Sequence, residues 1–127
     1  MSYAKTNVAD LEDKAPGYGM AEFGSARFAR EALGAERIGM AHYAVNPGQR
    51  VGFGHSHDQD EEMYVVVSGS GRMKVGDDII DLQPKDVVYC PPATMRAWEA
   101  GPDGLELLAF GAHTDGDGDM AMNWWTD

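Results

Sequence analysis

Short apolar runs, separated by turns, recur along most of this chain, and sixteen glycines and six prolines punctuate them. Runs of this length between such residues are typical of strands, and Gly76-Asp77 between two of them indicates a two-residue hairpin. No helical segments interrupt the runs after residue 36, so the pattern predicts an all-β fold, a small barrel or jelly roll. We expect strands near residues 37–45, 51–57, 62–68, 71–75, 78–82, 86–90, 95–100 and 105–110.

The two ends of the chain depart from this pattern, which predicts three parts. Residues 1–35 are of mixed composition and are expected to form an N-terminal arm. The arm contains one predicted short helix at 25–33, because a serine stands at its N-cap position and a glycine follows it. The barrel is expected at 36–113, and 114–127 is expected to be an acidic, polar and mobile tail whose final Trp124 and Trp125 dock on the barrel.

One predicted strand, 62–68, is apolar on both faces. With Tyr64 facing the interior, the period of two places Met63, Val65 and Val67 on the outside, and an outward apolar face needs a cover. We expect a homodimer to supply this cover, since a symmetric pair is the commonest closed assembly. The alternative is that the arm or the tail of the same chain folds over the face.

Charge and composition exclude several classes of partner. The 127 residues fit one domain with a sizeable core, and they carry a net charge of −11 with no basic stripe. Nucleic acids and anionic membranes are therefore poor partners. The single cysteine, Cys90, excludes a disulfide within the chain, and neither a signal peptide nor an apolar run of membrane-spanning length is present. We expect a cytoplasmic protein.

The densest chemistry lies in the stretch from His55 to Glu62. His55 and His57 are two residues apart on a predicted strand and therefore point to the same face. The four residues 58–61 have a common hairpin length, and such a hairpin would place Glu62 opposite His57, with Cβ atoms about 5 Å apart. Two imidazoles and a carboxylate would then converge, as a first-row transition metal requires. Glu61 competes for this place, but only one of the two glutamates can share a face with His57.

The order His55, His57, Glu62 and Gly69, with four and six residues in the last two gaps, resembles the first motif of the cupin superfamily. A partial second motif runs from Lys85 through two prolines to Arg96. The resemblance covers about residues 36–111 and implies a single cupin-like β-barrel. It also implies that Glu62, not Glu61, is the inward carboxylate, and that Arg96 stands where the family places its last metal-binding histidine.

The resemblance implies one divalent metal ion held by His55, His57 and Glu62. Arginine has no lone pair to give to a metal, so Arg96 cannot be a ligand. Two histidines and one carboxylate are the set associated with non-haem iron, and they are equally compatible with zinc, manganese or nickel. A further ligand from His42 or His113 stays open.

Three other residues are expected at a small-molecule pocket. Arg96 can bind a carboxylate or phosphate of a ligand, or can simply form an ion pair with Glu62 inside the barrel. Trp98 shares its face and can stack on a ligand, and Tyr64 lines the pocket or belongs to the core. Two functions follow: a metal-dependent enzyme of dioxygenase or isomerase type acting on a small anionic organic substrate, or a metal-free module that binds a small anion without turnover.

Overall fold

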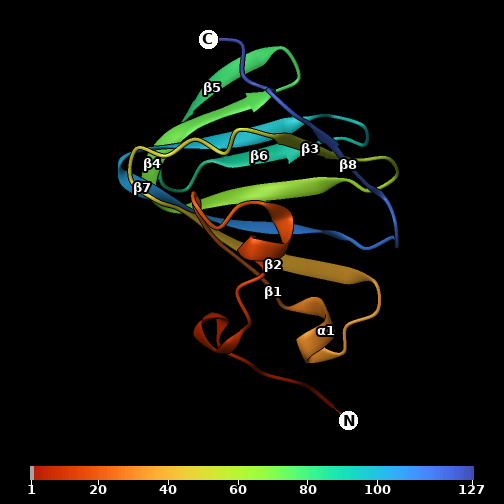
Figure 1. Ribbon diagram of the computed structural model, residues 1–127. Coiled ribbons are helices and arrows are strands. Elements are labelled where there is room, and N and C mark those ends of the chain that lie inside the picture. Colours follow the sequence, from red (N-terminus) through yellow and green to blue (C-terminus); the bar gives the residue numbers. More distant parts are fainter. Residues whose placement is uncertain (1) are drawn as a thin grey trace.

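Strands supply most of the regular structure in the computed structural model, which describes residues 2–127 (Figure 1). The only α-helix in that range is the single turn α1, and two 3₁₀ turns precede it. The all-β prediction is confirmed. The elements are 3₁₀ turns at Val8–Asp10 and Ala15–Tyr18, β1 (Gly24–Phe28), α1 (Arg30–Leu33), β2 (Ile38–Val45), β3 (Gly54–His57), β4 (Glu62–Val75), β5 (Asp78–Leu82), β6 (Val87–Cys90), β7 (Arg96–Ala112) and β8 (Gly118–Ala121).

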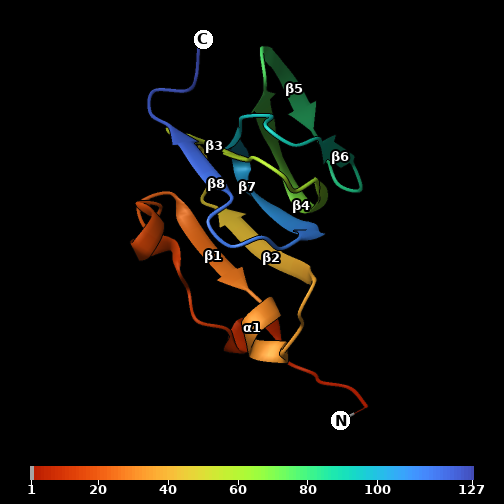
Figure 2. The same cartoon turned by 90° about the vertical axis from the view of Figure 1, so that its right-hand side faces the viewer.

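The strands form one antiparallel sheet that curls into a barrel. Its path runs β1-β2-β7-β3-β8, and β4 pairs with β5, β6 and β7. The N-terminal arm and α1 lie at one end of the sheet beside β1 and β2, while the C-terminus leaves from the opposite end (Figures 1 and 2). The side chains inside the curl make the core, which includes Tyr64, Met73, Trp98 and Leu107.

Two long strands, β4 and β7, replace four of the predicted ones. Segments 62–68 and 71–75 are one strand, because β4 continues through register shifts at Val66/Ser68 and Gly69/Gly71 against β7. Such bulges bend a strand without ending it. Gly69 is required here: its φ is +77°, and a Cβ on it would lie 2.0 Å from the carbonyl oxygen of Gly104.

The helix predicted over residues 25–33 is mostly wrong. Residues 25–28 belong to β1, which pairs with β2 so that Ala26 faces Tyr43, and only Arg30–Leu33 is helical. Ala26 is buried in the core. The ladder with β2 and the burial of this side chain outweigh a local helix propensity that is worth only tenths of a kcal/mol per residue.

The C-terminal residues 114–127, which we name the C-terminal strap, are not merely a polar tail. Within the strap, β8 pairs with β3 along its whole length. Trp124 lies beneath Lys74, whose Nζ is 3.5 Å from the ring centroid, and the indole N–H of Trp125 donates to the carbonyl of Val51 over 2.8 Å. The strap is therefore attached to the barrel along β3 and again at its end.

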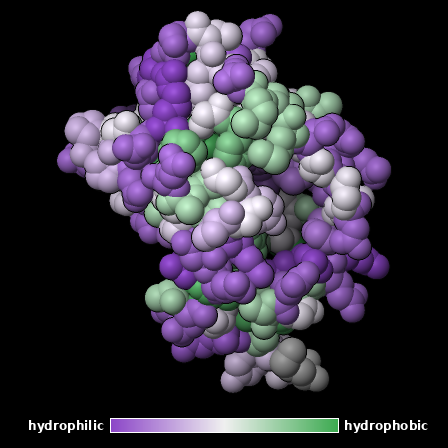
Figure 3. Space-filling view, in the orientation of Figure 1, coloured by the Kyte–Doolittle hydropathy of each residue, from purple (hydrophilic) through white to green (hydrophobic). Residues whose placement is uncertain are grey.

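The outer surface combines acidic and apolar regions. The face in Figure 3 is largely hydrophilic, with hydrophobic residues gathered in its upper part. On the outside of β4, Met63 is 50% exposed and Val67 45%, as the period of two predicts. They lie beside Val87, Tyr89 and Phe110 of the neighbouring strands β6 and β7. Among residues 2–127, no helix has the length and apolarity needed to cross a membrane.

Candidate metal centre

Three side chains converge at one end of the barrel interior. His55 and His57 project from β3, and Glu62 begins β4. Nε2 of His55 and Nε2 of His57 each lie 3.9 Å from the same Glu62 oxygen, Oε1. One ligand atom from each of the three residues falls within 4.8 Å of the others. The interior therefore gathers two imidazoles and one carboxylate at the positions that the sequence predicts.

The predicted hairpin between the histidines and Glu62 is wrong. His55 pairs with Arg96 on β7, and His57 pairs with Gly118 on β8. Glu62 instead pairs with Cys90 on one side and Gly111 on the other. The curl of the sheet brings β3 and the start of β4 to face one another across the interior, so the three side chains meet through space rather than across a ladder.

The parity of β4 separates the two neighbouring glutamates. Glu62 points inward, with 16% of its side chain exposed. Glu61 points outward and accepts a hydrogen bond of 2.5 Å from the hydroxyl of Tyr89. Glu62 is therefore the carboxylate of the cluster.

Arg96 holds this carboxylate from within the core. Its side chain is 0% exposed, and its Nη2 donates to Oε1 of Glu62 over 2.6 Å. Its Nε donates to the hydroxyl of Tyr64 over 2.9 Å, its Nη1 donates to the carbonyl of Thr94 over 2.8 Å, and the Tyr64 hydroxyl itself donates to Oε1 of Glu62. The ion pair that the sequence left open against an anion clamp is thus formed.

Hydrogen bonding and burial set the charge states of the cluster. Burial would raise the pKa of Glu62, but the nearby imidazole of His55, the hydrogen bonds from Tyr64 and Arg96, and the Arg96 charge outweigh it and lower the pKa to about 2. Burial lowers the pKa of His55, despite an opposing contribution from Glu62, so its imidazole is neutral near pH 7. A neutral imidazole and an ionised carboxylate are the forms that bind metals, and the donor set fits a divalent ion.

The positive charge of the Arg96 guanidinium opposes tight binding of a metal ion. A divalent ion and a unit positive charge 4 Å apart repel by roughly 8 kcal/mol at an effective dielectric of 20. Because Arg96 also binds the oxygen of Glu62 that faces both histidines, an ion at the centre would compete with it. The arrangement can hold a divalent ion with reduced affinity, or can remain stable without one.

The remaining predicted residues lie around the centre. Trp98 is buried, with its ring centroid 5.4 Å from those of His55 and Tyr64. Its indole N–H has no hydrogen-bond partner within residues 2–127. His42 binds Glu106 over 2.7 Å, and His113 binds Asp115 over 2.6 Å. Neither histidine joins the cluster of His55, His57 and Glu62.

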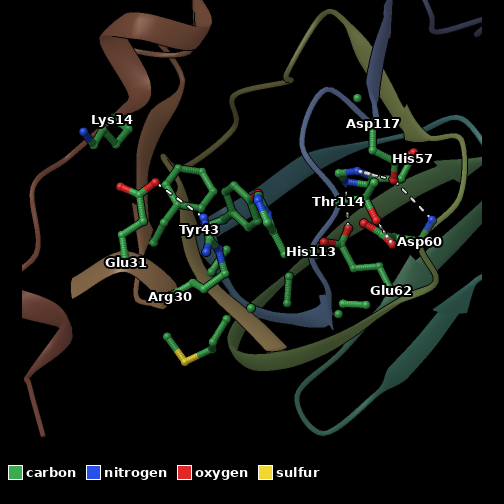
Figure 4. Close-up of a pocket in the computed structure, with 18 of the residues that line it drawn as sticks. Lys14, Arg30, Glu31, Tyr43, His57, Asp60, Glu62, His113, Thr114 and Asp117 are labelled. Carbon is green, nitrogen blue, oxygen red and sulfur yellow. Dashed lines mark hydrogen bonds and ion pairs between the residues drawn. The ribbon is translucent and has the colours of Figure 1, made fainter. Parts of the chain in front are cut away.

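A cavity of about 480 Å³ opens at the end of the barrel where His57 and Glu62 lie (Figure 4). Its inner wall includes His57, Glu62 and Asp117, whereas Tyr64, Arg96 and Trp98 are absent from the lining contributed by residues 2–127. The predicted pocket residues thus stand behind the wall. The N-terminal arm supplies the outer part of the cavity wall. The sequence does not predict this role of the arm, because no local pattern connects the arm to the histidines. The outer lining includes Lys14, Tyr18, Phe28, Arg30 and Glu31.

Known proteins share both sequence and fold with this chain. The family model of the cupin domain matches residues 41–109. Over 64 residues the chain is 30% identical to a 5-nitrosalicylic acid 1,2-dioxygenase of a Bradyrhizobium species. The match spans 50% of this chain but only 30% of the dioxygenase.

Solved structures with the same fold extend over nearly the whole chain. A cupin protein from Bacteroides fragilis superposes with a TM-score of 0.72 at 22% identity, covering 100% of this chain and 98% of that protein. Oxalate decarboxylase from Bacillus subtilis superposes with a TM-score of 0.76 at 21% identity, covering 94% of this chain and 32% of the decarboxylase. Mn(II) centres are described for that decarboxylase. At these identities the likeness is one of fold.

Proposed function

The chain belongs to the cupin family, and we propose that it is a metal-dependent enzyme that holds one divalent ion in its barrel and acts on a small organic carboxylate. The observation that carries the proposal is the convergence of His55, His57 and Glu62 within 4.8 Å, with His57 and Glu62 at the inner wall of a cavity of about 480 Å³. A cavity of that volume accommodates a small molecule.

The three converging side chains would hold the ion, and iron, manganese, zinc and nickel all accept this donor set. The bound ion would supply Lewis acidity and, for iron or manganese, one-electron chemistry. Around it, Tyr64 and Arg96 keep Glu62 ionised and fixed in place. The indole N–H of Trp98, which has no hydrogen-bond partner among residues 2–127, stands behind the cavity wall beside His55, where it can donate to a buried water molecule.

The lining of the cavity and the substrates of the similar proteins support the proposed substrate class. Both 5-nitrosalicylic acid and oxalate are carboxylates. Lys14 and Arg30 line the outer part of the cavity and can meet such an anion, while Tyr18, Phe28 and Tyr43 offer an aromatic wall. Arg96 is buried behind Glu62 and is therefore assigned to the support of that carboxylate. Dioxygenase chemistry on an aromatic carboxylate is the reaction class that this combination favours.

A metal-free anion-binding module is the second candidate. The ion pair between Arg96 and Glu62, 2.6 Å long, neutralises the buried carboxylate without any ion. In that case His57, which lines the cavity, would bind a small anion there without turnover. The two candidates differ in whether metal is needed.

We also propose that the chain pairs with a second copy through the outer face of β4 and β6. Met63 of β4 stands beside Tyr89 of β6 and Phe110 of β7, and Val65 stands beside Val87. These rows put adjoining apolar side chains on the outside of the sheet, where a second copy would exclude water from them.

Oxygen uptake by protein reconstituted separately with Fe²⁺ and Mn²⁺ tests the enzymatic proposal. The substrates are salicylate, 5-nitrosalicylate and oxalate, with mass spectrometry of the products. We expect turnover of an aromatic carboxylate with one of the metals, and its loss in His57→Ala. Binding of these anions to the metal-free protein without turnover under any loading would favour the binding module instead.

A further inference from the structure

We propose that Asp117, which the C-terminal strap supplies, is the positioning residue for His57, and that the strap thereby sets the metal affinity of the centre. The inference rests on the proposed metal-binding function. Residue 117 lies beyond the stretch matched by the cupin family, which ends at residue 109. Asp117 therefore lies outside the part of the chain that carries the family's sequence match.

The imidazole of His57 lies between two carboxylates. Its Nδ1 is 3.6 Å from Oδ2 of Asp117, and its Nε2 is 3.9 Å from Oε1 of Glu62. The Asp117 side chain is only 2% exposed, so water screens this contact poorly. A carboxylate beside Nδ1 favours the tautomer with hydrogen on that nitrogen, which leaves the lone pair of Nε2 directed toward the centre.

Asp117 also organises the loop between the histidine strand and Glu62. Its Oδ1 accepts a hydrogen bond from the backbone N–H of Gln59 over 2.7 Å, and its Oδ2 accepts one from that of Asp60 over 3.2 Å. Its backbone carbonyl accepts from the N–H of Asp58 over 3.0 Å. Both carboxylate oxygens already accept backbone hydrogen bonds, which favours a positioning role over direct ligation of metal.

The position of Asp117 is fixed by the strap on either side of it. Immediately after it, Gly118 pairs with His57 in the ladder between β8 and β3. Just before it, the hydroxyl of Thr114 donates to Oδ1 of Asp60 over 2.9 Å. At the end of the strap, Asp127 forms ion pairs with Arg50 and Arg72 at 2.9 and 2.8 Å. Figure 4 shows Asp117, Thr114 and Asp60 gathered around His57.

Calorimetric titration of the metal-free full-length protein with Mn²⁺ and Zn²⁺ provides the first test. Loss of a carboxylate behind a metal-binding histidine weakens metal affinity by about 10-fold to 100-fold. We expect that loss in Asp117→Asn, which keeps the side-chain shape. The matched control is Asp119→Asn, which removes the same charge from an exposed position of β8 and should change the affinity less than about twofold. Equal affinities in both variants and the wild type would overturn the proposal.

Nitrogen NMR of His57 in the metal-free wild type provides a second test that does not depend on metal. At a pH where the ring is neutral, we expect the Nδ1–H tautomer, and a shift toward Nε2–H in Asp117→Asn. An Nε2–H tautomer in the wild type would overturn the proposal, even if the variant failed to fold. If the wild type binds no metal but has the Nδ1–H tautomer, the metal function fails and the positioning of His57 by Asp117 stands.

Discussion

Nη2 of Arg96 lies 2.6 Å from Oε1 of Glu62, and that same oxygen faces Nε2 of both His55 and His57 at 3.9 Å. One carboxylate oxygen thus serves an ion pair and completes a potential metal site. Any ion that binds must share Glu62 with a permanent positive charge, because a guanidinium does not lose its proton in a protein. Without an ion, the same ion pair neutralises the buried carboxylate.

Replacing Arg96 with histidine should tighten metal binding. The change removes the positive charge and offers an imidazole in its place. If even about 1.4 kcal/mol of the repulsion is relieved, the affinity for Zn²⁺ or Mn²⁺ rises at least tenfold. Titration calorimetry measures it, and Arg96→Met separates the loss of charge from the gain of a ligand. Equal or weaker binding by Arg96→His would show that the guanidinium does not oppose the ion.

The metal-free protein should lose stability when Arg96 is replaced by methionine. The substitution leaves the carboxylate of Glu62 buried without its cation, and such a change costs about 3–5 kcal/mol. Urea unfolding in the presence of a chelator measures the free energy of unfolding. Arg72→Met is the control: Arg72 binds Glu99 in a partly exposed pair, and we expect a loss of about 1 kcal/mol or less. Similar losses in the two variants would contradict the central role of the buried pair.

Glu62 should make the metal-free fold sensitive to acid. Its pKa is lowered from 4.5 to about 2 in the folded state, so its contribution is fully present above pH 4.5 and is lost as the pH falls toward 2. That difference corresponds to roughly 3 kcal/mol. Glu62→Gln should therefore be less stable than the wild type near pH 7, and the gap should close by about pH 2. A gap that is independent of pH would refute the lowered pKa.

Light scattering at micromolar concentration tests the proposed dimer. We expect a mass near twice the chain mass of 13.8 kDa. Val87→Glu, at a position that is 59% exposed, should shift the mass toward the monomer because it buries a charge in the interface. Met122→Glu, on the exposed strap outside the face of β4 and β6, should leave the mass unchanged. A monomeric wild type would contradict the proposal.

The sequence predicts which side chains face the interior more reliably than it predicts which strands pair. The period of two along β4 correctly separates inward Glu62 and Tyr64 from outward Glu61 and Met63, because a buried face fixes strand parity. The predicted pairing of β3 with β4 is wrong, since a local spacing cannot distinguish a hairpin from a long-range ladder. The bulges that join the predicted segments into β4 and β7 likewise depend on the pairing between those strands.

The sequence predicts an N-terminal arm, but it predicts neither the place of the arm in the cavity wall nor the contact between Asp117 and His57, for a similar reason. The acidic, glycine-rich sequence around Asp117 has no apolar alternation, so nothing local indicates that it forms a strand or reaches His57, sixty residues earlier. Residues 25–28 have helical composition, yet pairing with β2 makes them a strand. In each case tertiary contacts, which no short sequence pattern encodes, determined the local structure.

The central claim is that His55, His57 and Glu62 hold a divalent ion. Its most direct test is calorimetric titration of metal-free, untagged protein with Mn²⁺ and Zn²⁺, comparing the wild type with Glu62→Gln and with Glu61→Gln as the outward-facing control. We predict one ion per chain for the wild type and Glu61→Gln, and at least a tenfold loss of affinity for Glu62→Gln. Absence of binding by the wild type, or equal affinity in all three proteins, would contradict the claim.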